Sequence, residues 1–188
     1  MPGNLAHHPK FELLRQNTGT RYSQRRPVRY TVREKFFTLK GDNDINNEMG
    51  QPVFRVQGKL FSARSIMMIK DLAGNDLARV QRKLLALMPR YEIALNGGAT
   101  TTVRRRLSNP LKPKWTIDTV GQDGMLLTGD FFGYNFVIER AGTQVASISK
   151  GWVTLTNAYG VDIAPGENDV LLLGVVLVLE AEKSRKKR

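Results

Sequence analysis

The stretch VLLLGVVLVLE at residues 170–180, near the end of the chain, decides the fold. Its first ten residues are valine, leucine or glycine, so a helix made of them has no polar face and must be covered on every side. At about 1.5 Å per residue, such a run extends roughly 15 Å. A helix that spans a bilayer needs roughly 20 apolar residues. We therefore predict no transmembrane span and expect a helix buried inside the protein's own fold.

The residues on either side of this run favour a helix. The Pro-Gly pair at 165–166 ends the preceding segment, and Asn168 or Asp169 can cap a helix that begins there. Acidic residues precede the run and basic residues at 183–186 follow it, which suits the two ends of a helix dipole. A fully buried β-strand is the alternative, because valine-rich runs are also typical of strands.

Upstream of the run, from residue 28 on, short stretches of β-forming residues alternate with turn signals. Asn96-Gly97 lies between two such stretches and is a strong hairpin signal, while residues 41–44 and 46–50 predict turns. About twelve short strands favour a sandwich or a closed barrel, whose bore the ten-residue run would fit, over a parallel α/β fold. The predicted strands are residues 30–39, 52–56, 65–70, 77–82, 90–95, 100–107, 114–120, 125–130, 134–140, 144–150 and 158–163.

A weak internal repeat supports a barrel made of two similar halves. IKDLAG at residues 69–74 runs into LARV at 77–80, and IERAG at 138–142 runs into VASI at 145–148. In both copies an alanine and a β-branched residue follow the hairpin glycine by four and six positions. Two unrelated hairpins of ordinary composition are the alternative.

The composition argues against an enzyme. The chain has no cysteine, which excludes disulfides, thiolate metal sites and a cysteine nucleophile and is compatible with a reducing cytosol. His7 and His8 are the only histidines, and two adjacent histidines near the N-terminus make a poor metal site. Carboxylates lie mainly in predicted turns, which turn chemistry explains. We predict a non-enzymatic protein without cofactor or metal, in the cytoplasm or at the periphery of a membrane.

The net charge of +12 is concentrated at the two ends of the chain. Residues 1–30 carry +5 and residues 183–188 another +5, whereas the rest carries only +2. We therefore predict a flexible basic arm at 1–27, a barrel domain at 28–182 and a basic tail at 183–188. Such ends attract RNA, DNA or anionic lipid, although a solvated tail explains them equally well. The arm lacks the apolar core of a signal peptide, and its arginine content leaves a transit peptide as an alternative.

Within the domain, the densest basic cluster is Arg104-Arg105-Arg106, with Lys112 and Lys114 close behind it. In a strand, Arg104 and Arg106 would share one face and Arg105 would lie on the other. Guanidinium groups pair well with phosphate oxygens, so we predict a surface that binds anions or lipid headgroups here. An exposed edge strand protected by its charge is the alternative.

Arg79, Arg82 and Lys83 form a second, weaker cluster, which the leucine-rich residues 84–88 follow. Exposed apolar residues beside basic ones suit a membrane interface. Leucine is usually buried, however, so we expect the three leucines of this stretch to pack in the core. We expect core packing for Trp115 as well, since no stacking pattern accompanies it.

Four segments occur in a familiar order and spacing: YTVREK at 30–35, INNEMGQPVFRVQGK at 45–59, the hairpin at 71–79, and AYGVDIAPGEND at 158–169 before the apolar run. Together they resemble the LURP-one-related family of the Tubby C-terminal-like superfamily over residues 28–182. The resemblance implies a mainly β protein, with a twelve-stranded barrel enclosing a central hydrophobic C-terminal helix. This agrees with what the residues themselves predict.

The resemblance implies less about function, because the biochemical roles of the family are mostly unassigned. Related Tubby domains bind phosphoinositides, and phospholipid scramblases are similar at a greater distance, but no binding motif of either aligns here. We expect a binding module that contacts an anionic partner, with membrane lipid headgroups as the first choice. The alternatives are a protein-binding scaffold or signalling module and non-specific nucleic-acid association through the basic tails.

Overall fold

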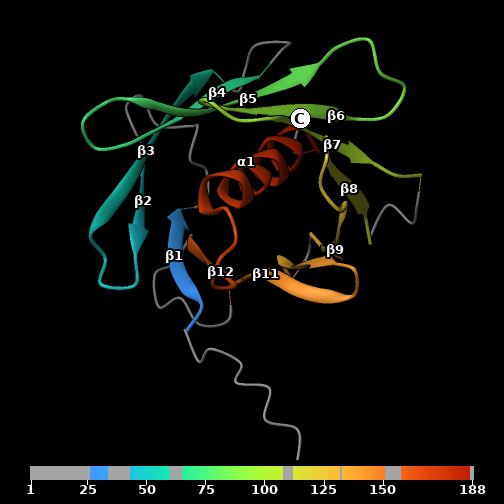
Figure 1. Ribbon diagram of the computed structural model, residues 1–188. Helices are drawn as coiled ribbons and strands as arrows, with labels where there is room; N and C mark the ends of the chain where they lie inside the picture. Colours follow the sequence, from blue (N-terminus) through green and yellow to red (C-terminus); the bar gives the residue numbers. More distant parts are fainter. Residues whose placement is uncertain are drawn as a thin grey trace, which may run out of the picture.

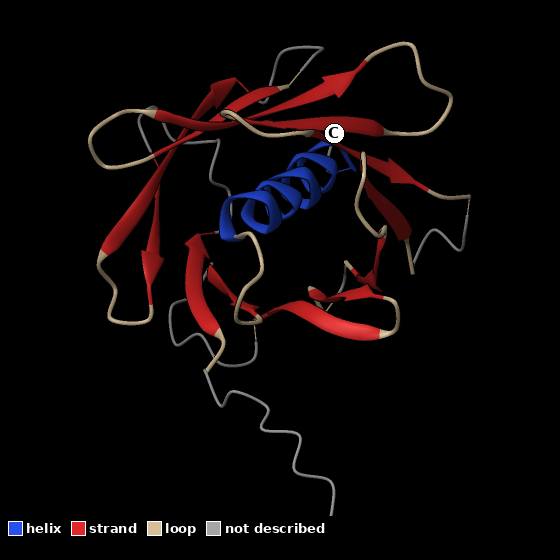
Figure 2. Ribbon diagram, viewed as in Figure 1, coloured by secondary structure: helices blue, strands red, loops and turns tan. Residues whose placement is uncertain are grey.

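The computed structural model describes most of the predicted barrel domain, and the predicted arm lies almost wholly outside it. In the described part, twelve antiparallel strands form one closed barrel with a helix inside (Figures 1 and 2). This confirms the predicted fold class. The described residues are 26–33, 43–59, 65–107, 112–131, 133–150 and 158–186.

The strands follow the chain around the barrel, and β12 closes the sheet against β1. Each connection is therefore a simple antiparallel turn or loop, as in an up-and-down barrel. The strands are β1 (Val28–Arg33), β2 (Asn43–Asn47), β3 (Pro52–Lys59), β4 (Ile66–Lys70), β5 (Asp76–Lys83), β6 (Arg90–Leu95), β7 (Thr100–Arg105), β8 (Lys114–Thr119), β9 (Met125–Asp130), β10 (Asn135–Arg140), β11 (Thr143–Ser149) and β12 (Ala158–Ile163).

The apolar run forms the helix α1 (Asp169–Lys186), not a buried strand. Asn168 caps it, because its side-chain Oδ1 accepts a hydrogen bond from the Leu171 amide at 2.9 Å. The helix lies against β4, β5, β6 and β12. At Gly174 it approaches the sheet so closely that a Cβ atom would lie 3.1 Å from Ile93 Cγ2. No helix in the described ranges is long and apolar enough to span a membrane.

Alternation along the strands builds the core around α1. Inward residues such as Val80, Ile93 and Ile117 are fully buried, as are Leu173 and Leu177 of the helix. Burying side chains of this size stabilises a fold by about 1.5–3 kcal/mol each. The helix thus replaces solvent in the bore with a continuous apolar core.

The prediction of turns at residues 41–44 and 46–50 was wrong for residues 43, 44, 46 and 47, which belong to β2. This strand is polar except for Ile45, which is fully buried and lies opposite Phe54 of β3. Ladders to both β1 and β3 hold it in place. Tertiary pairing therefore overrides a local composition typical of turns.

The internal repeat corresponds to hairpins in equivalent places. The β4–β5 and β10–β11 hairpins are six strands apart along the barrel. Both ladders carry a register shift at the aligned pair of residues, Ile69/Lys70 in one and Ile138/Glu139 in the other. The two six-stranded halves therefore share a bulge as well as a sequence pattern.

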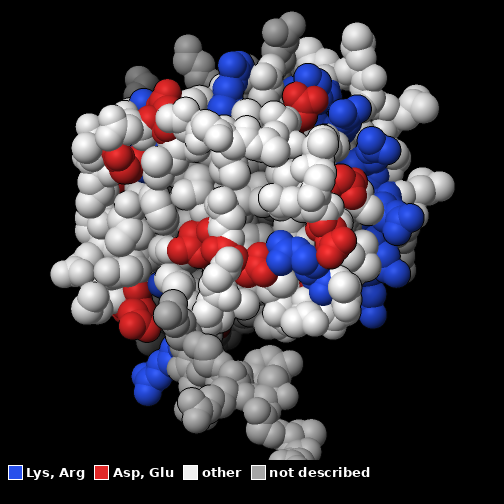
Figure 3. Space-filling view, viewed as in Figure 1, with Lys and Arg blue, Asp and Glu red and all other residues white. Residues whose placement is uncertain are grey.

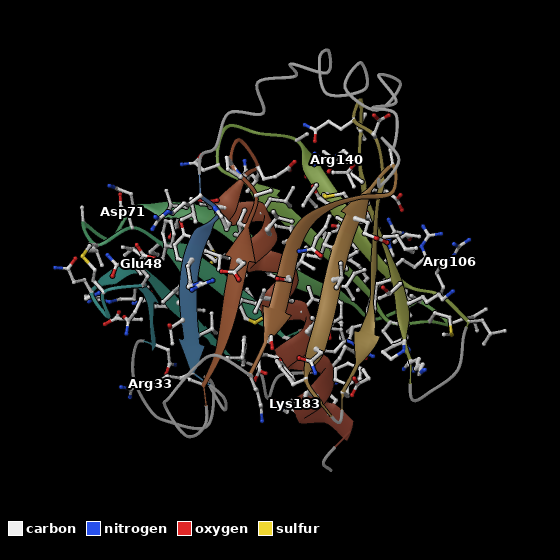
Figure 4. All side chains as sticks on the ribbon, turned by 90° about the horizontal axis from the view of Figure 1, so that it is seen from below. Arg33, Glu48, Asp71, Arg106, Arg140 and Lys183 are labelled. Atoms are coloured by element: carbon white, nitrogen blue, oxygen red, sulfur yellow. The ribbon has the colours of Figure 1, made fainter. Side chains whose placement is uncertain are left out.

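The barrel has two distinct ends, which we call the N-mouth and the C-mouth after the end of α1 that lies there. Arg140 contacts the loop that leads into the helix and lies at the N-mouth, whereas Lys183 lies at the C-mouth; Figure 4 shows the two at opposite ends. Because the strands alternate in direction, the β5–β6, β7–β8 and β9–β10 connections all lie at the C-mouth. The β2–β3, β4–β5 and β8–β9 turns lie at the N-mouth.

Candidate anion-binding surface at one end of the barrel

Most of the predicted basic residues lie on one outer surface, formed by β5 to β8. Figure 3 shows basic side chains gathered along this side of the molecule, and Figure 4 shows Arg106 pointing away from the barrel. The register places Lys83, Arg90 and Arg104 side by side in one row across β5, β6 and β7. We call the outward-facing cations on this surface nearest the C-mouth the basic flank: Lys83, Arg90, Arg104, Arg106, Lys112 and Lys114.

One carboxylate accompanies the row of cations. Glu92 on β6 lies 2.9 Å from Lys83 Nζ and 3.7 Å from the guanidinium of Arg90, measured from its carboxylate oxygens. Arg104 on the next strand, β7, and Arg106 just past the end of that strand are exposed, and Arg106 donates its amide to Lys114 O. The flank thus carries a positive excess that Glu92 only partly offsets.

The edge-strand interpretation of the triple arginine is wrong, because β7 pairs with β6 on one side and β8 on the other. The predicted alternation is confirmed: Arg104 and Arg106 are exposed, and Arg105 is half-buried on the inner face. Arg79 lies on the outer face of β5 farther from the C-mouth, and Arg82 faces inward like Arg105. The structure therefore separates Arg82 and Arg105 from the other predicted residues.

The leucines that were expected in the core are exposed. Leu85 and Leu87 are 105% and 106% exposed, and Leu84 is 45% exposed. They lie in the β5–β6 connection beyond the last paired residues, Lys83 and Arg90, so strand alternation no longer turns them inward. Leu107, 90% exposed, lies just past β7, whose Arg105 amide bonds to Pro89 O of the same connection at 2.9 Å. We call these four residues the C-mouth leucines.

Inside the C-mouth, the last turns of α1 carry two buried glutamates, Glu180 and Glu182. The hydroxyl of Tyr134 donates to Glu180, and that of Tyr91 donates to Glu182 at 2.8 Å. Lys183 Nζ lies 3.9 Å from Glu180 and 4.0 Å from the centre of the Tyr134 ring. Each buried carboxylate therefore has a donor, which offsets the cost of removing it from water.

The pKa of Tyr91 is raised well above its usual value, chiefly because burial penalises the phenolate. The negative charge of Glu182 and its hydrogen bond act in the same direction. The positive charges of Arg82 and Arg185 act against them, which places both arginines near this tyrosine. The C-mouth interior is therefore a mixed polar network with several cations.

The N-mouth is built differently. Arg140 holds Glu167 through two hydrogen bonds of 2.5 and 2.8 Å, which raise the pKa of the guanidinium. Tyr30 donates to Asp169 at 2.6 Å. The pKa of Tyr30 is raised by burial first and by this bond second.

A hollow of about 740 Å³ opens beside these groups, lined by Gly121, Gln122, Asp123, Met125, Arg140, Gly166, Glu167, Asn168, Leu171 and Leu172. The N-mouth is thus rich in acidic groups, one of which is paired with Arg140, and Figure 3, which views this end, shows acidic side chains across the centre.

Sequence reasoning missed Arg90 and Leu107 as surface residues. Arg90 was interpreted only as the start of a strand, yet its cross-strand position beside Lys83 follows once the β5–β6 register is known. Leu107 was interpreted as the end of a strand, which the structure ends at Arg105. The position of Arg90 on the surface could have been predicted from the register of the β5–β6 and β6–β7 pairs. No local signal in the sequence marks Leu107.

A closed meander of antiparallel strands around an apolar C-terminal helix defines a helix-filled β-barrel, an architecture consistent with the Tubby C-terminal-like superfamily. Among the described residues, no group of three or more histidine, cysteine or acidic side chains can hold a metal ion. The model of the LURP-one-related family matches residues 28–180, and the chain belongs to this family.

Two similar proteins extend this assignment. The chain is 27% identical over 149 residues to YxjI of Bacillus subtilis (strain 168), described as an uncharacterized protein; the match covers 79% of this chain and 90% of that protein. The X-ray structure of AT5G01750 from Arabidopsis thaliana superposes with a TM-score of 0.57, covering 85% of this chain and 92% of that one. At 14% identity, that likeness concerns the fold alone.

Proposed function

We propose that this protein is a non-enzymatic binding module that docks its C-mouth on an anionic membrane surface. The observation that carries the proposal is the position of the C-mouth leucines directly beside the basic flank. Leu85 and Leu87 are fully exposed and follow Lys83 in the chain. Apolar residues that can enter the bilayer next to cations that meet anionic headgroups are typical of peripheral membrane proteins.

The magnitudes support reversible binding. Burying one leucine side chain in an apolar medium is worth about 1.5–3 kcal/mol, and each lysine or arginine near an anionic surface adds about 1 kcal/mol. The exposed leucines and the cations are present together, so neither group has to supply the binding free energy alone. The electrostatic share decays within about 8 Å at physiological ionic strength, so binding should weaken as salt is added.

The basic flank is unfavourable for folding taken by itself. Like charges directly opposite each other on neighbouring strands destabilise a sheet, and Lys83, Arg90 and Arg104 form such a row. Glu92 relieves only part of this repulsion. An anionic partner would remove the rest, which favours a binding role over a stabilising one.

Sedimentation with vesicles tests the proposal. Full-length protein is mixed with vesicles of phosphatidylcholine alone, and with vesicles in which about one fifth of the lipid is phosphatidylserine. We expect pelleting with the anionic vesicles and its loss at high salt. Equal pelleting with both vesicle types, or pelleting with neither, would refute the proposal. If an excess of single-stranded RNA abolishes binding of the full-length protein but not of a variant that lacks residues 1–27 and 187–188, the attraction belongs to the two ends of the chain and not to the C-mouth.

A further inference from the structure

Two arginines point into the C-mouth instead of joining the basic flank. Arg82 continues the inward series of Ala78 and Val80 on β5, and Arg105 continues that of Thr101 and Val103 on β7. Each is the last inward-facing residue of its strand before the mouth and is half-buried. The inward-facing residues that precede them on the two strands are apolar or small. On these strands an arginine therefore faces inward only at the mouth.

Each of these arginines has a hydrogen-bond donor without an acceptor in the described part of the protein. The Nε atoms of Arg82 and Arg105 are buried and lack a hydrogen-bond partner. So does the indole Nε1 of Trp115, whose side chain is 1% exposed and lies directly opposite Arg105. Buried polar groups are nearly always hydrogen-bonded, and leaving one unpaired destabilises the fold. Three such donors at one end of the barrel therefore indicate a missing acceptor.

The strand register brings the donors within reach of one another. Arg82 lies opposite Tyr91 on β6, and the Arg105 amide donates to the carbonyl oxygen of Pro89, which lies two residues before Tyr91 and directly precedes that strand. The two arginines thus flank β6, with Cα atoms about 12 Å apart from strand spacing and rise. Two long side chains directed inward from that separation can grip one small group between them.

The acids in the mouth do not occupy these arginines. Glu180 accepts from Tyr134 and lies near Lys183, while Glu182 accepts from Tyr91. Among the described residues inside the C-mouth, the four cations Arg82, Arg105, Lys183 and Arg185 outnumber the two glutamates, so this set carries a net positive charge. The acceptor that completes it is therefore an anion.

We infer that Arg82, Arg105 and the indole N–H of Trp115 form a recessed site for a phosphate group. The planar fork of arginine matches phosphate oxygens and can bind them through two parallel bonds. The natural source of the phosphate rests on the proposed function: when the C-mouth leucines dock on a membrane, the phosphate of a lipid headgroup would enter the mouth. A soluble phosphate presents the same chemistry, so the two sources are separated by experiment.

The first arm uses inorganic pyrophosphate as the probe and ¹⁵N-labelled full-length protein. The chain has two tryptophans, and Trp115→Phe assigns their two indole signals. We expect pyrophosphate to shift the Trp115 indole signal, and Arg105→Gln or Arg82→Gln to weaken binding about tenfold or more. Arg79→Gln is the matched control, because it removes the same charge from an exposed residue on the outer face of β5 that lies outside the basic flank. An unshifted indole, or equal weakening by the Arg79 and Arg105 variants, would overturn the inference.

Folding is checked by thermal unfolding, and Arg105→Lys provides a second variant that keeps the charge but loses the fork. We expect Arg105→Gln to unfold near the wild-type temperature, since the Nε atom of Arg105 has no hydrogen bond in the protein to lose. We also expect Arg105→Lys to bind pyrophosphate more weakly than the wild type. If Arg105→Lys binds as tightly as the wild type, only charge matters and the recessed site is wrong.

The second arm compares vesicles that contain phosphatidate, which has a terminal phosphate, with vesicles of phosphatidylserine at equal surface charge. A preference for phosphatidate that Arg105→Gln removes and Arg79→Gln leaves in place assigns the site to a lipid headgroup. Pyrophosphate binding without any vesicle binding would keep the phosphate site and refute membrane docking. Vesicle binding that neither pyrophosphate nor Arg105→Gln weakens would keep membrane docking and refute the phosphate site.

Discussion

The two mouths of the barrel carry similar side chains arranged in opposite ways. The N-mouth turns expose Met49, Leu72 and Val120, but each lies in a turn that also holds an acid: Glu48, Asp71 or Asp123. The C-mouth exposes its leucines next to the basic flank. Exposed apolar residues are thus common to both ends, and charge is what distinguishes them. An anionic surface would attract one mouth and repel the other, which sets the orientation in which the protein docks.

The largest expected effect comes from removing apolar contact at the C-mouth. Replacing Leu85 and Leu87 together by serine should weaken binding to anionic vesicles at least about a hundredfold, since burying each leucine side chain is worth about 1.5–3 kcal/mol and about 1.4 kcal/mol is a factor of ten. Met49→Ser at the N-mouth, whose side chain is 73% exposed, is the matched control and should leave binding unchanged. Vesicle flotation over a range of lipid concentrations measures both. Equal losses for the two variants would remove the distinction between the mouths.

Neutralising the basic flank should have the next largest effect. Arg104→Gln with Arg106→Gln removes two cations, each worth about 1 kcal/mol near an anionic surface, so vesicle affinity should fall about thirtyfold at low salt. The difference from the wild type should shrink as salt is added. Lys70→Gln with Arg140→Gln at the N-mouth removes the same charge and should have a small effect. A loss that persists undiminished in high salt would contradict an electrostatic role for the flank.

The hydrogen bonds inside the two mouths should differ in their contribution to stability. Tyr91→Phe leaves the buried carboxylate of Glu182 without its hydroxyl donor, which should lower the free energy of unfolding by about 1–3 kcal/mol. Tyr30→Phe removes the bond to Asp169, which is only partly buried and should cost less. Urea unfolding of the two variants measures the difference. A larger loss for Tyr30→Phe would place the more important buried bond at the N-mouth.

The same two tyrosines predict a loss of stability at alkaline pH. Burial raises the pKa of both Tyr30 and Tyr91 in the folded state. Above pH about 10 the unfolded chain loses these protons while the folded protein keeps them. Stability is therefore complete below that pH and falls by about 1.4 kcal/mol per pH unit for each tyrosine above it. Tyr91→Phe should flatten this decline, and an unchanged slope in that variant would show that Tyr91 does not contribute.

The architecture could be predicted from the sequence because the signals for its helix and strands are local and redundant. The apolar run at 170–179 with its Asn168 cap predicts a buried helix, and alternation in β6 to β12 predicts strands. β2 was missed because pairing on both sides, and not its own composition, makes it a strand. The order of secondary structure can therefore be read from the residues, while elements held by their neighbours cannot.

The candidate site was only partly predictable, for a related reason. Strand alternation by itself separates Arg105 from Arg104 and Arg106, and the structure confirms that separation. Alternation cannot reveal that Lys83, Arg90 and Arg104 share a row, because that depends on register between strands. Nor can it place Leu85 outside the core, because burial statistics describe strands and helices better than the loops beyond them. The face on which each strand residue lies was thus predictable, whereas positions that depend on register or on where a strand ends were not.

The smallest expected effect tests whether the N-mouth has a purely structural role. Asn168→Ala removes the cap of α1 and should lower the free energy of unfolding by about 1 kcal/mol. Because α1 is buried along most of its length, the loss should stay local to the first turn and leave vesicle binding unchanged. Urea unfolding and vesicle flotation on the same preparation measure both quantities. If losing the cap also weakened vesicle binding, the two mouths would be coupled through the helix, and the N-mouth could no longer be treated as independent of the docking surface.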